Sequence, residues 1–416
     1  MKDRLLGALK KARADYAEVR WETDDSTMVA YRGEELDRVN TGKYAGGIVR
    51  ACARGGWGVA TFDSLDDLDY QVGQACQAAA LVGKETTRLA ESPVPSGAEI
   101  KAALKRDFRG VSLDAKLAQA ARYNRIILQA DPAIESSHVT YADRFRTVHF
   151  ASTCGAYYME ERPRVTLYGV AVARAGALVQ QAMKSWTSPS DYDVVLNRDE
   201  LVAETARRAV DLLKAPPCRG GRRMVILDPE LAGVFVHEAF GHLSEADFLY
   251  ENSKMRDLMH LGRAMGGKQL SIFDDGSMAG LMGTQAYDDE GTPTGRTYLI
   301  KEGVLSGHLH SLETAGKMGA RPTGNARAIG RGAPPIVRMT NTCIEGGSES
   351  FRQLIAGVDD GLYACDMLGG QTMMEMFTFS AAYGYRIRNG QVGELVRDVV
   401  LTGNVFETLR ARAEIT

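Results

Sequence analysis

Residues 236–247 of this 416-residue chain read VHEAFGHLSEAD. An apolar run, LAGVFV at residues 231–236, leads into this stretch and predicts a buried helix. The stretch holds two histidines, His237 and His242, and Glu238 directly follows the first of them. Two imidazoles and a carboxylate this close in sequence form a candidate metal site, although a polar cluster at the end of a helix would use the same residue types.

The spacing of the two histidines sets a condition on the backbone. In the H-E-x-x-H pattern of zinc peptidases, the histidines are four residues apart and share one face of a helix. Here His242 follows His237 by five residues, which at roughly 100° per residue places it about 140° away around a regular helix. Both imidazoles can reach one metal ion only if the helix widens into a π-bulge or ends near Gly241, a residue type that tolerates either deviation. The sequence therefore predicts an H-E-x-x-x-H metal site on a locally distorted helix.

Neighbouring residues acquire roles if the histidines are metal ligands. Glu238 is placed to act as general base on a metal-bound water, and Zn²⁺ is the metal favoured by imidazole ligands and hydrolytic chemistry. A catalytic zinc site takes a third protein ligand. Glu245, three residues after His242, is either that ligand or a carboxylate that orients a histidine. Cys365 is another possible third ligand, although a single cysteine in a strand more often packs as a small apolar residue.

Two polar, turn-prone stretches later in the chain are candidates for substrate binding. Residues 321–327 read RPTGNAR and residues 339–342 read MTNT. Asn325, Thr340 and Asn341 could hydrogen-bond a peptide backbone, but ordinary loops have the same composition. Residues 291–295, GTPTG, lack the strand–loop–helix order of a phosphate-binding loop, so no nucleotide site is expected.

Composition narrows the class of protein. With 44% hydrophobic and 25% charged residues, the chain is typical of a globular protein of two or three domains. A net charge of −3 provides no electrostatic attraction for nucleic acid, and no window approaches the roughly 18 apolar residues of a membrane span. The amino terminus lacks the pattern of a signal peptide, and the six cysteines lack C-x-x-C pairing, which is typical of reduced thiols in the cytoplasm.

Helix and strand signals predict an α+β fold in two domains. Up to residue 215, helices alternate with antiparallel strand candidates, and the polar stretch 90–112 is a possible sub-boundary. Prolines and glycines at residues 215–221 mark the main boundary. We therefore expect an N-terminal domain, residues 1–215, of helices with an antiparallel sheet. The C-terminal domain, residues 222–416, is expected to be β-rich and barrel- or sandwich-like, and to carry the motif helix.

Several further blocks accompany the histidine motif along the chain. In order they are HEAFGHLSEAD (237–247), DDG (274–276), DDEGTP (288–293), RPTGN (321–325), RMTNT (338–342), GGQ (369–371) and TGN (402–404). These blocks and their order resemble the TldD/PmbA family of metallopeptidases over nearly the whole chain. The PmbA-type subunits lack the H-E-x-x-x-H stretch, so the resemblance is to the TldD branch.

The resemblance implies a cytoplasmic zinc peptidase in which His237 and His242 bind the metal and Glu238 activates the water. Members of the family hydrolyse unfolded or small peptides in a chamber, as homodimers or as heterodimers with a PmbA-like (TldE) subunit. They are linked to maturation of peptide antibiotics and removal of an antitoxin. Family members continue beyond the helix near Thr402 to a glycine-rich tail whose cysteine completes the zinc site, and this sequence ends at Thr416. The alternative expectation is therefore a catalytically impaired or non-catalytic peptide-binding subunit.

Overall fold

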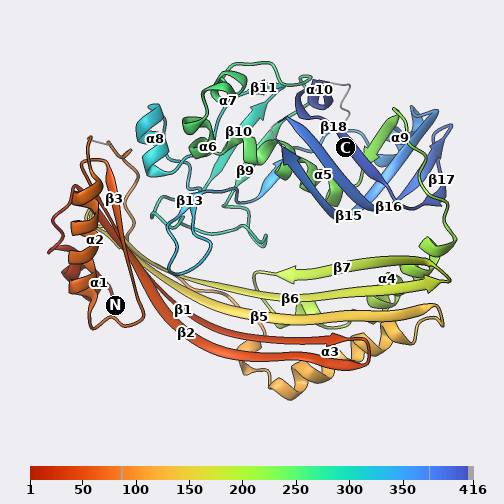
Figure 1. Cartoon of the computed structure of the whole chain (residues 1–416), viewed down its shortest axis with the longest axis horizontal. Helices are drawn as coiled ribbons and strands as arrows, with labels where there is room; N and C mark the ends of the chain where they lie inside the picture. The colour runs from red at the N-terminus through yellow and green to blue at the C-terminus, as the bar shows by residue number, and fades with distance from the viewer. Residues whose placement is uncertain (86–87, 374, 411–416) are drawn as a thin grey trace.

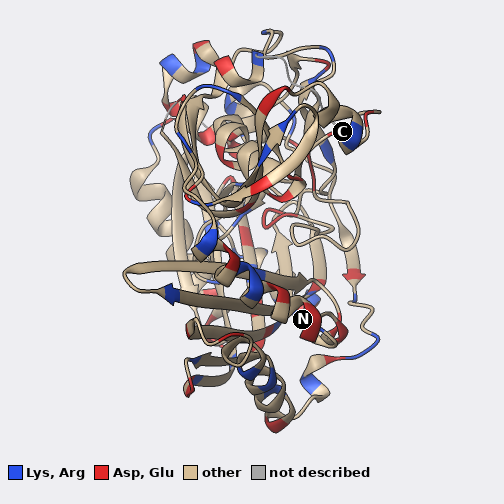
Figure 2. Cartoon of the chain, turned by 90° about the vertical axis from the view of Figure 1, so that its right-hand side faces the viewer, with Lys and Arg blue, Asp and Glu red and all other residues tan. Residues whose placement is uncertain are grey.

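The computed structural model describes residues 1–85, 88–373 and 375–410. A long, curved sheet from the N-terminal half lies below a group of smaller sheets and helices from the C-terminal half (Figure 1). Lysine and arginine are interspersed with aspartate and glutamate over both halves (Figure 2). Within the described ranges, no helix combines the length and the apolar character that crossing a membrane requires.

The long sheet has seven strands in the order β3-β2-β1-β5-β6-β4, and β7 also pairs with β6. All neighbours are antiparallel except β4, which runs parallel to β6. Residues 96–100, expected as part of a linker, form β4. The strands are β1 (Tyr16–Arg32), β2 (Glu35–Ala53), β3 (Gly56–Phe62), β4 (Ser96–Ile100), β5 (Ile134–Ser152), β6 (Tyr157–Ala175) and β7 (Leu178–Ser188).

Helices cover one face of this sheet, which we call the outer face. Val19 and Val29 of β1 both point to it, the first into the cluster packed by α1 and α2 and the second into the cluster packed by α3 and α4. Gly58 lets α2 approach β3 closely, because a Cβ atom there would lie 2.0 Å from the carbonyl oxygen of Ala75. The helices and 3₁₀ turns of this half are α1 (Lys2–Leu9), α2 (Leu68–Val82), η1 (Phe108–Gly110), α3 (Leu113–Leu128), η2 (Tyr192–Val195) and α4 (Asp199–Lys214).

The opposite face, the inner face, is charged and holds the C-terminal half. Arg162 of β6 donates to Asp289 (3.0 Å), and Arg50 of β2 donates to Glu290 (3.1 Å). Arg20 of β1 donates to Glu22 (2.8 Å) and lies 4.0 Å from Asp289. Burial opposes ionisation of Asp289, yet the surrounding guanidinium groups hold its pKa below the ordinary value. The two halves are therefore joined by buried ion pairs.

The described residues of the C-terminal half form three separate sheets. Their strand orders are β17-β16-β15-β8 with β18 on β16, β11-β10-β9-β14, and β12-β13. The strands are β8 (Met224–Leu227), β9 (Ile272–Asp275), β10 (Arg296–Lys301), β11 (Val304–Leu305), β12 (Ala326–Arg327), β13 (Ile336–Val337), β14 (Thr342–Ile344), β15 (Asp360–Met373), β16 (Met376–Arg388), β17 (Gln391–Val396) and β18 (Val400–Asn404).

A helix, α5 (Pro229–Val236), lies at the centre of this half. It continues into η3 (His237–Gly241) and η4 (His242–Ser244). One apolar core joins Val236 and Phe240 of this segment to Leu299 of β10 and Phe379 of β16, so the segment contacts two of the sheets. The other helices of this half are α6 (Ala246–Glu251), α7 (Ser253–Leu258), α8 (Leu312–Met318), α9 (Phe351–Ala356) and α10 (Val405–Arg410).

The predicted α+β class is confirmed, but of the two forms expected for the C-terminal domain, barrel-like or sandwich-like, the described residues do not form the closed barrel. Every sheet formed by the described residues has open edges, and none closes on itself. Glycine content and many short strands suggested a barrel, whereas the strands are divided among sheets that pack around the α5 segment. The two-domain division at residues 215–222 stays a prediction.

Candidate metal centre

Both ends of α5 are fixed by neighbours. Asp228 caps its start by accepting a hydrogen bond from the amide of Leu231 (2.7 Å), and Pro229 occupies the first helical position. The second carboxylate oxygen of Asp228 accepts from the amide of Asp366 in β15 (2.9 Å). At the other end, the ring of Phe235 packs edge-on against Phe377, with centroids 5.2 Å apart. The backbone therefore enters the histidine motif in a fixed orientation.

The motif departs from α-helix geometry as its spacing predicts. Residues His237–Gly241 form a single π-helical turn, and His242–Ser244 form a 3₁₀ turn. The wider turn brings His237 and His242 together, with ring centroids 5.0 Å apart and planes at 79°. Gly241 permits close packing here, because a Cβ atom at this position would lie 1.9 Å from the sulfur of Met339 and would displace that side chain. The predicted π-bulge is confirmed.

The distorted turn gathers three potential metal ligands. His237, Glu238 and His242 each offer one ligand atom, and these atoms lie within 4.8 Å of one another. Nε2 of His242 lies 3.9 Å from a carboxylate oxygen of Glu238, and these side chains are 41% and 30% exposed. Imidazoles are ordinary zinc ligands, and a carboxylate beside them can act as base on a metal-bound water, so the group fits a Zn²⁺ site.

Glu245 lies behind His242. Its carboxylate lies 3.1 Å from Nδ1 of His242, and an ionised carboxylate can only accept, so Nδ1 carries the proton and Nε2 keeps its lone pair. Arg338 donates to the other carboxylate oxygen (2.8 Å). This arrangement favours the orienting role of the two roles predicted for Glu245. The hydrogen bond that His242 donates to Glu245 raises the pKa of His242, whereas burial and the charge of His242 lower the pKa of His237.

Cys365 is placed differently. It is buried in β15, and its sulfur lies 4.0 Å from the carbonyl oxygen of Tyr363. Burial, followed by the charge of Asp228, raises the pKa of the thiol to about 12, and a metal ligand must be the thiolate. Cys365 does not belong to the group of described ligand atoms around His237. The identity of a third ligand stays a prediction.

The candidate substrate-binding residues surround two aspartates of β9. Thr340 and Asn325 donate to the buried carboxylate of Asp274, at 2.6 and 2.8 Å. Asn341 donates to the carbonyl oxygen of Asp275 (2.8 Å). These bonds use the amide groups and the hydroxyl within the protein, so the geometry supports a role in loop structure, and a role in binding substrate stays a prediction.

Sequence spacing offered no sign of Arg338 as part of the site, because it lies 93 residues from Glu245. It appeared only within the RMTNT block. That block of polar residues, whose role could not be assigned, was the one signal in the sequence. In the structure, Arg338 of this block donates to Glu245 of the motif, and Thr340 donates to Asp274 of β9.

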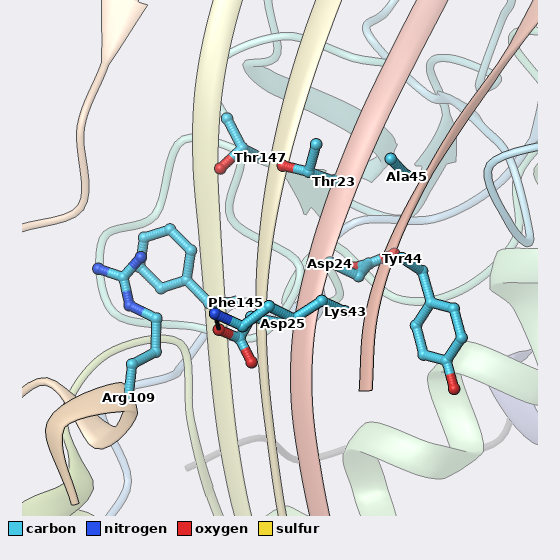
Figure 3. A pocket seen from close by; sticks show the side chains of 9 residues that line it. All are labelled: Thr23, Asp24, Asp25, Lys43, Tyr44, Ala45, Arg109, Phe145 and Thr147. Carbon is cyan, nitrogen blue, oxygen red and sulfur yellow. Dashed lines mark ion pairs between the residues drawn. The ribbon is translucent and has the colours of Figure 1, made fainter. Parts of the chain in front are cut away.

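A hollow elsewhere is separate from the histidine motif. It lies on the outer face of the sheet, the face on which Thr27 of β1 is hydrogen-bonded to Lys116 of α3 (3.2 Å). The guanidinium of Arg109 lies 3.5 Å from the centroid of the Phe145 ring (Figure 3). The motif belongs to the C-terminal half, which lies on the opposite, inner side of the same sheet (Figure 1). The hollow is lined by Thr23, Asp24, Asp25, Lys43, Tyr44, Ala45, Arg109, Phe145 and Thr147.

A His–Glu–His group on a distorted helix, with one imidazole oriented by a carboxylate, is typical of metal-dependent hydrolases. Comparison with known families agrees. Models of PmbA/TldA metallopeptidase domain 1, central domain and C-terminal domain match residues 17–81, 106–215 and 220–416. The chain belongs to the PmbA/TldD family of metallopeptidases.

Relatives and solved structures give the same result. A metalloprotease of Synechocystis sp. is 41% identical over 399 residues, which are 96% of this chain and 86% of the relative. A zinc metalloprotease TldD homolog of Saccharolobus solfataricus is 30% identical over 67% of this chain and 63% of its own length. The crystal structure of TldE from Thermococcus kodakarensis has the same fold, with a TM-score of 0.81, 17% identity, and coverage of 100% of this chain and 93% of that one.

Proposed function

We propose that this chain hydrolyses peptide bonds of unfolded or small peptides, with Zn²⁺ held by His237 and His242. The observation that carries the proposal is the π-helical turn, which brings both imidazoles and Glu238 within 4.8 Å of one another although their spacing does not suit an α-helix. The name of the Saccharolobus solfataricus relative, a zinc metalloprotease, supports the choice of metal.

Glu238, Glu245 and the two histidines have different roles in the proposed hydrolysis. Zinc bound here would polarise the scissile carbonyl group and lower the pKa of a water molecule. Glu238, partly exposed and beside Nε2 of His242, takes the proton of the attacking water and passes it to the leaving amine. Glu245 fixes the His242 ring in the tautomer whose Nε2 can bind metal.

Replacement of Glu238 by Gln tests the assignment. The variant should lose about 10²- to 10⁴-fold in the rate of cleavage of a fluorescence-quenched unstructured peptide, because it loses the general base. Its melting temperature and its zinc content by elemental analysis should match those of the wild type. Wild-type cleavage should stop with a chelator and return with zinc.

The matched control is Glu251→Gln, which removes an exposed carboxylate from α6. Cleavage by Glu238→Gln at the wild-type rate would reject Glu238 as the base. Zinc bound at one ion per chain with no cleavage by the wild type would favour the alternative, a peptide-binding subunit that does not cut.

We also propose that the chain acts in the cytoplasm as a dimer, either with itself or with a TldE-like subunit. All six cysteines are free, which suits a reducing compartment. The similar fold of TldE supports a partner of the same architecture. Light scattering on the purified chain, alone and with a candidate partner, would measure the mass of the assembly, and a monomer under both conditions would contradict this part of the proposal.

A further inference from the structure

Four arginines lie in two directly opposed pairs on the inner face of the long sheet. In the register of β5 and β6, Arg144 is opposite Arg164 and Arg146 is opposite Arg162. Like charges directly opposite each other on one face destabilise a sheet unless other groups balance them. We therefore compared the groups that balance the charge of each arginine.

Three of the four arginines are balanced by carboxylates. Arg144 donates to Asp24 (2.6 Å). Arg146 donates through Nε to Glu22 (2.8 Å). Arg162 donates to Glu160 and to Asp289. Each of these guanidinium groups is used to hold the sheet together or to hold the C-terminal half against it.

Arg164 is the exception. Its guanidinium group has neither an ion pair nor a hydrogen bond with the described residues, and the residue is exposed. Burial of part of the group lowers its pKa, and the charges that act on it are those of Arg144, Arg327 and Arg146, all positive. A guanidinium surrounded by cations and open to solvent is a site that an anion would stabilise.

Arg327 is a second cation without an acceptor in the described part of the chain. It stands in β12 between Ala326 and Ala328, whose amides donate to the carboxylates of Asp288 (3.0 Å) and Asp289 (2.9 Å). Those bonds fix the backbone, while the Arg327 residue is exposed. The carboxylates that act on its charge are Asp289, Glu245 and Asp274, and each is hydrogen-bonded to other groups.

Hydrogen-bonded neighbours connect Arg327 to the sheet on one side. Asp289 accepts hydrogen bonds from the amide of Ala328 and from Arg162, which is two residues from Arg164 on the same face of β6.

Other neighbours connect Arg327 to the metal motif. Arg327 pairs with Ile336 of β13, and Arg338, two residues further along, donates to Glu245, the hydrogen-bond partner of His242. The two unpaired arginines therefore lie where the inner face of the sheet meets the part of the chain that carries the motif.

We propose that Arg164 and Arg327 bind a carboxylate of the substrate peptide and so set which peptide bond reaches Glu238. This proposal rests on the proposed peptidase function. The planar guanidinium fork matches a carboxylate in two parallel hydrogen bonds, which gives orientation as well as affinity. The carboxylate is either the carboxyl terminus of the peptide or the side chain of an Asp or Glu residue, and both present the same group.

Peptide variants distinguish the two sources. One parent peptide with a single Glu and a free carboxyl terminus is compared with its carboxy-terminal amide and with its Glu→Gln form. For the wild type, removal of the recognised carboxylate should raise KM by roughly 10- to 100-fold, the range expected for a lost hydrogen bond to a charged group. Arg164→Gln and Arg327→Gln should show the raised KM with the parent peptide and no further increase with the neutral form.

Arg144→Gln is the matched control, because it removes the opposed arginine whose charge Asp24 already balances. It should keep the wild-type preference for the charged peptide. Arg164→Gln should melt no lower than the wild type, since it relieves repulsion between like charges. If Arg164→Gln lowers the melting temperature and leaves the preference for the charged peptide unchanged, Arg164 is structural and the proposal is overturned. Dissociation of the dimer by Arg164→Gln, with the same unchanged preference, would overturn it as well.

Binding to Glu238→Gln separates this proposal from the proposed function. Fluorescence anisotropy of labelled parent and neutral peptides measures the preference without turnover. Discrimination in binding without any wild-type cleavage would support the carboxylate subsite and overturn the hydrolysis. Cleavage with equal binding and equal KM for charged and neutral peptides would overturn the subsite and leave the hydrolysis intact.

Discussion

Ionisable side chains are concentrated in two regions of the molecule, the histidine motif and the contact between the N-terminal and C-terminal halves. The two regions differ in the partners of those side chains. At the contact, Arg20, Glu22 and Asp289 are almost wholly buried, and each has an ion pair. In the motif, Glu238 and His242 are partly exposed, and Nε2 of His242 lies 3.9 Å from a carboxylate oxygen of Glu238. Buried charges must have partners inside the protein, whereas the partly exposed motif leaves ligand atoms such as Nε2 of His242 free to bind a metal ion.

The largest effect is expected from breaking a satisfied charge. Asp289→Asn removes a buried carboxylate that Arg162 and Arg20 share, and leaves these two guanidinium groups with Glu160 and Glu22 as their remaining counter-charges. The free energy of unfolding should fall by about 3–5 kcal/mol. Urea unfolding followed by circular dichroism measures it. The control, Asp66→Asn at an exposed pair with Arg4, should leave stability unchanged.

The pH dependence has a defined sign. Because the folded-state pKa of Asp289 lies below its unfolded value, its contribution is fully present above the unfolded pKa of about 3.9 and is lost as pH falls through the folded pKa. The gap in stability between wild type and Asp289→Asn should therefore be constant near neutral pH and shrink below about pH 4. A gap that stays constant into acid would show that the charge of Asp289 is not its cause.

The same comparison explains what could be predicted from the sequence. The motif is local, so the five-residue spacing was enough to predict that the helix either widens into a π-bulge or ends near Gly241, and the structure has the π-helical turn. The ion pairs of the contact join residues more than 100 positions apart, such as Arg162 and Asp289, and no periodicity reports them. The barrel was predicted wrongly for a related reason, since strand propensity does not say which strands share a sheet. Asn325 and Thr340 were recognised as special, but their common partner Asp274 is distant in sequence.

An intermediate effect, on zinc affinity, is expected at Glu245, which pairs with both Arg338 and His242 of the motif. Glu245→Gln keeps the shape of the side chain but removes the charge that holds the His242 ring. Zinc affinity, measured by competition with a chromophoric chelator, should fall by about 10- to 100-fold, as for other groups that orient a metal ligand. In the zinc-free chain, the pKa of His242 measured by NMR should fall, because the hydrogen bond to Glu245 that raises it becomes a weaker bond to a neutral amide oxygen. Unchanged affinity and an unchanged pKa would argue against the orienting role.

The smallest effect is expected one step further out, at Arg338. Its guanidinium is 31% exposed, so solvent screens the bond to Glu245, and such pairs contribute about 0.2–1 kcal/mol. Arg338→Gln loses this restraint on Glu245 but also removes a positive charge that opposes a cation beside His242, and the two effects have opposite signs. Zinc affinity should therefore stay within about fivefold of the wild type. The pKa of His242 in the zinc-free chain should rise, opposite to its change in Glu245→Gln, because the arginine lowers it. A loss of zinc affinity as large as that of Glu245→Gln would instead mean that Glu245 cannot orient the ring without Arg338, and the satisfied pair would then belong to the metal site itself.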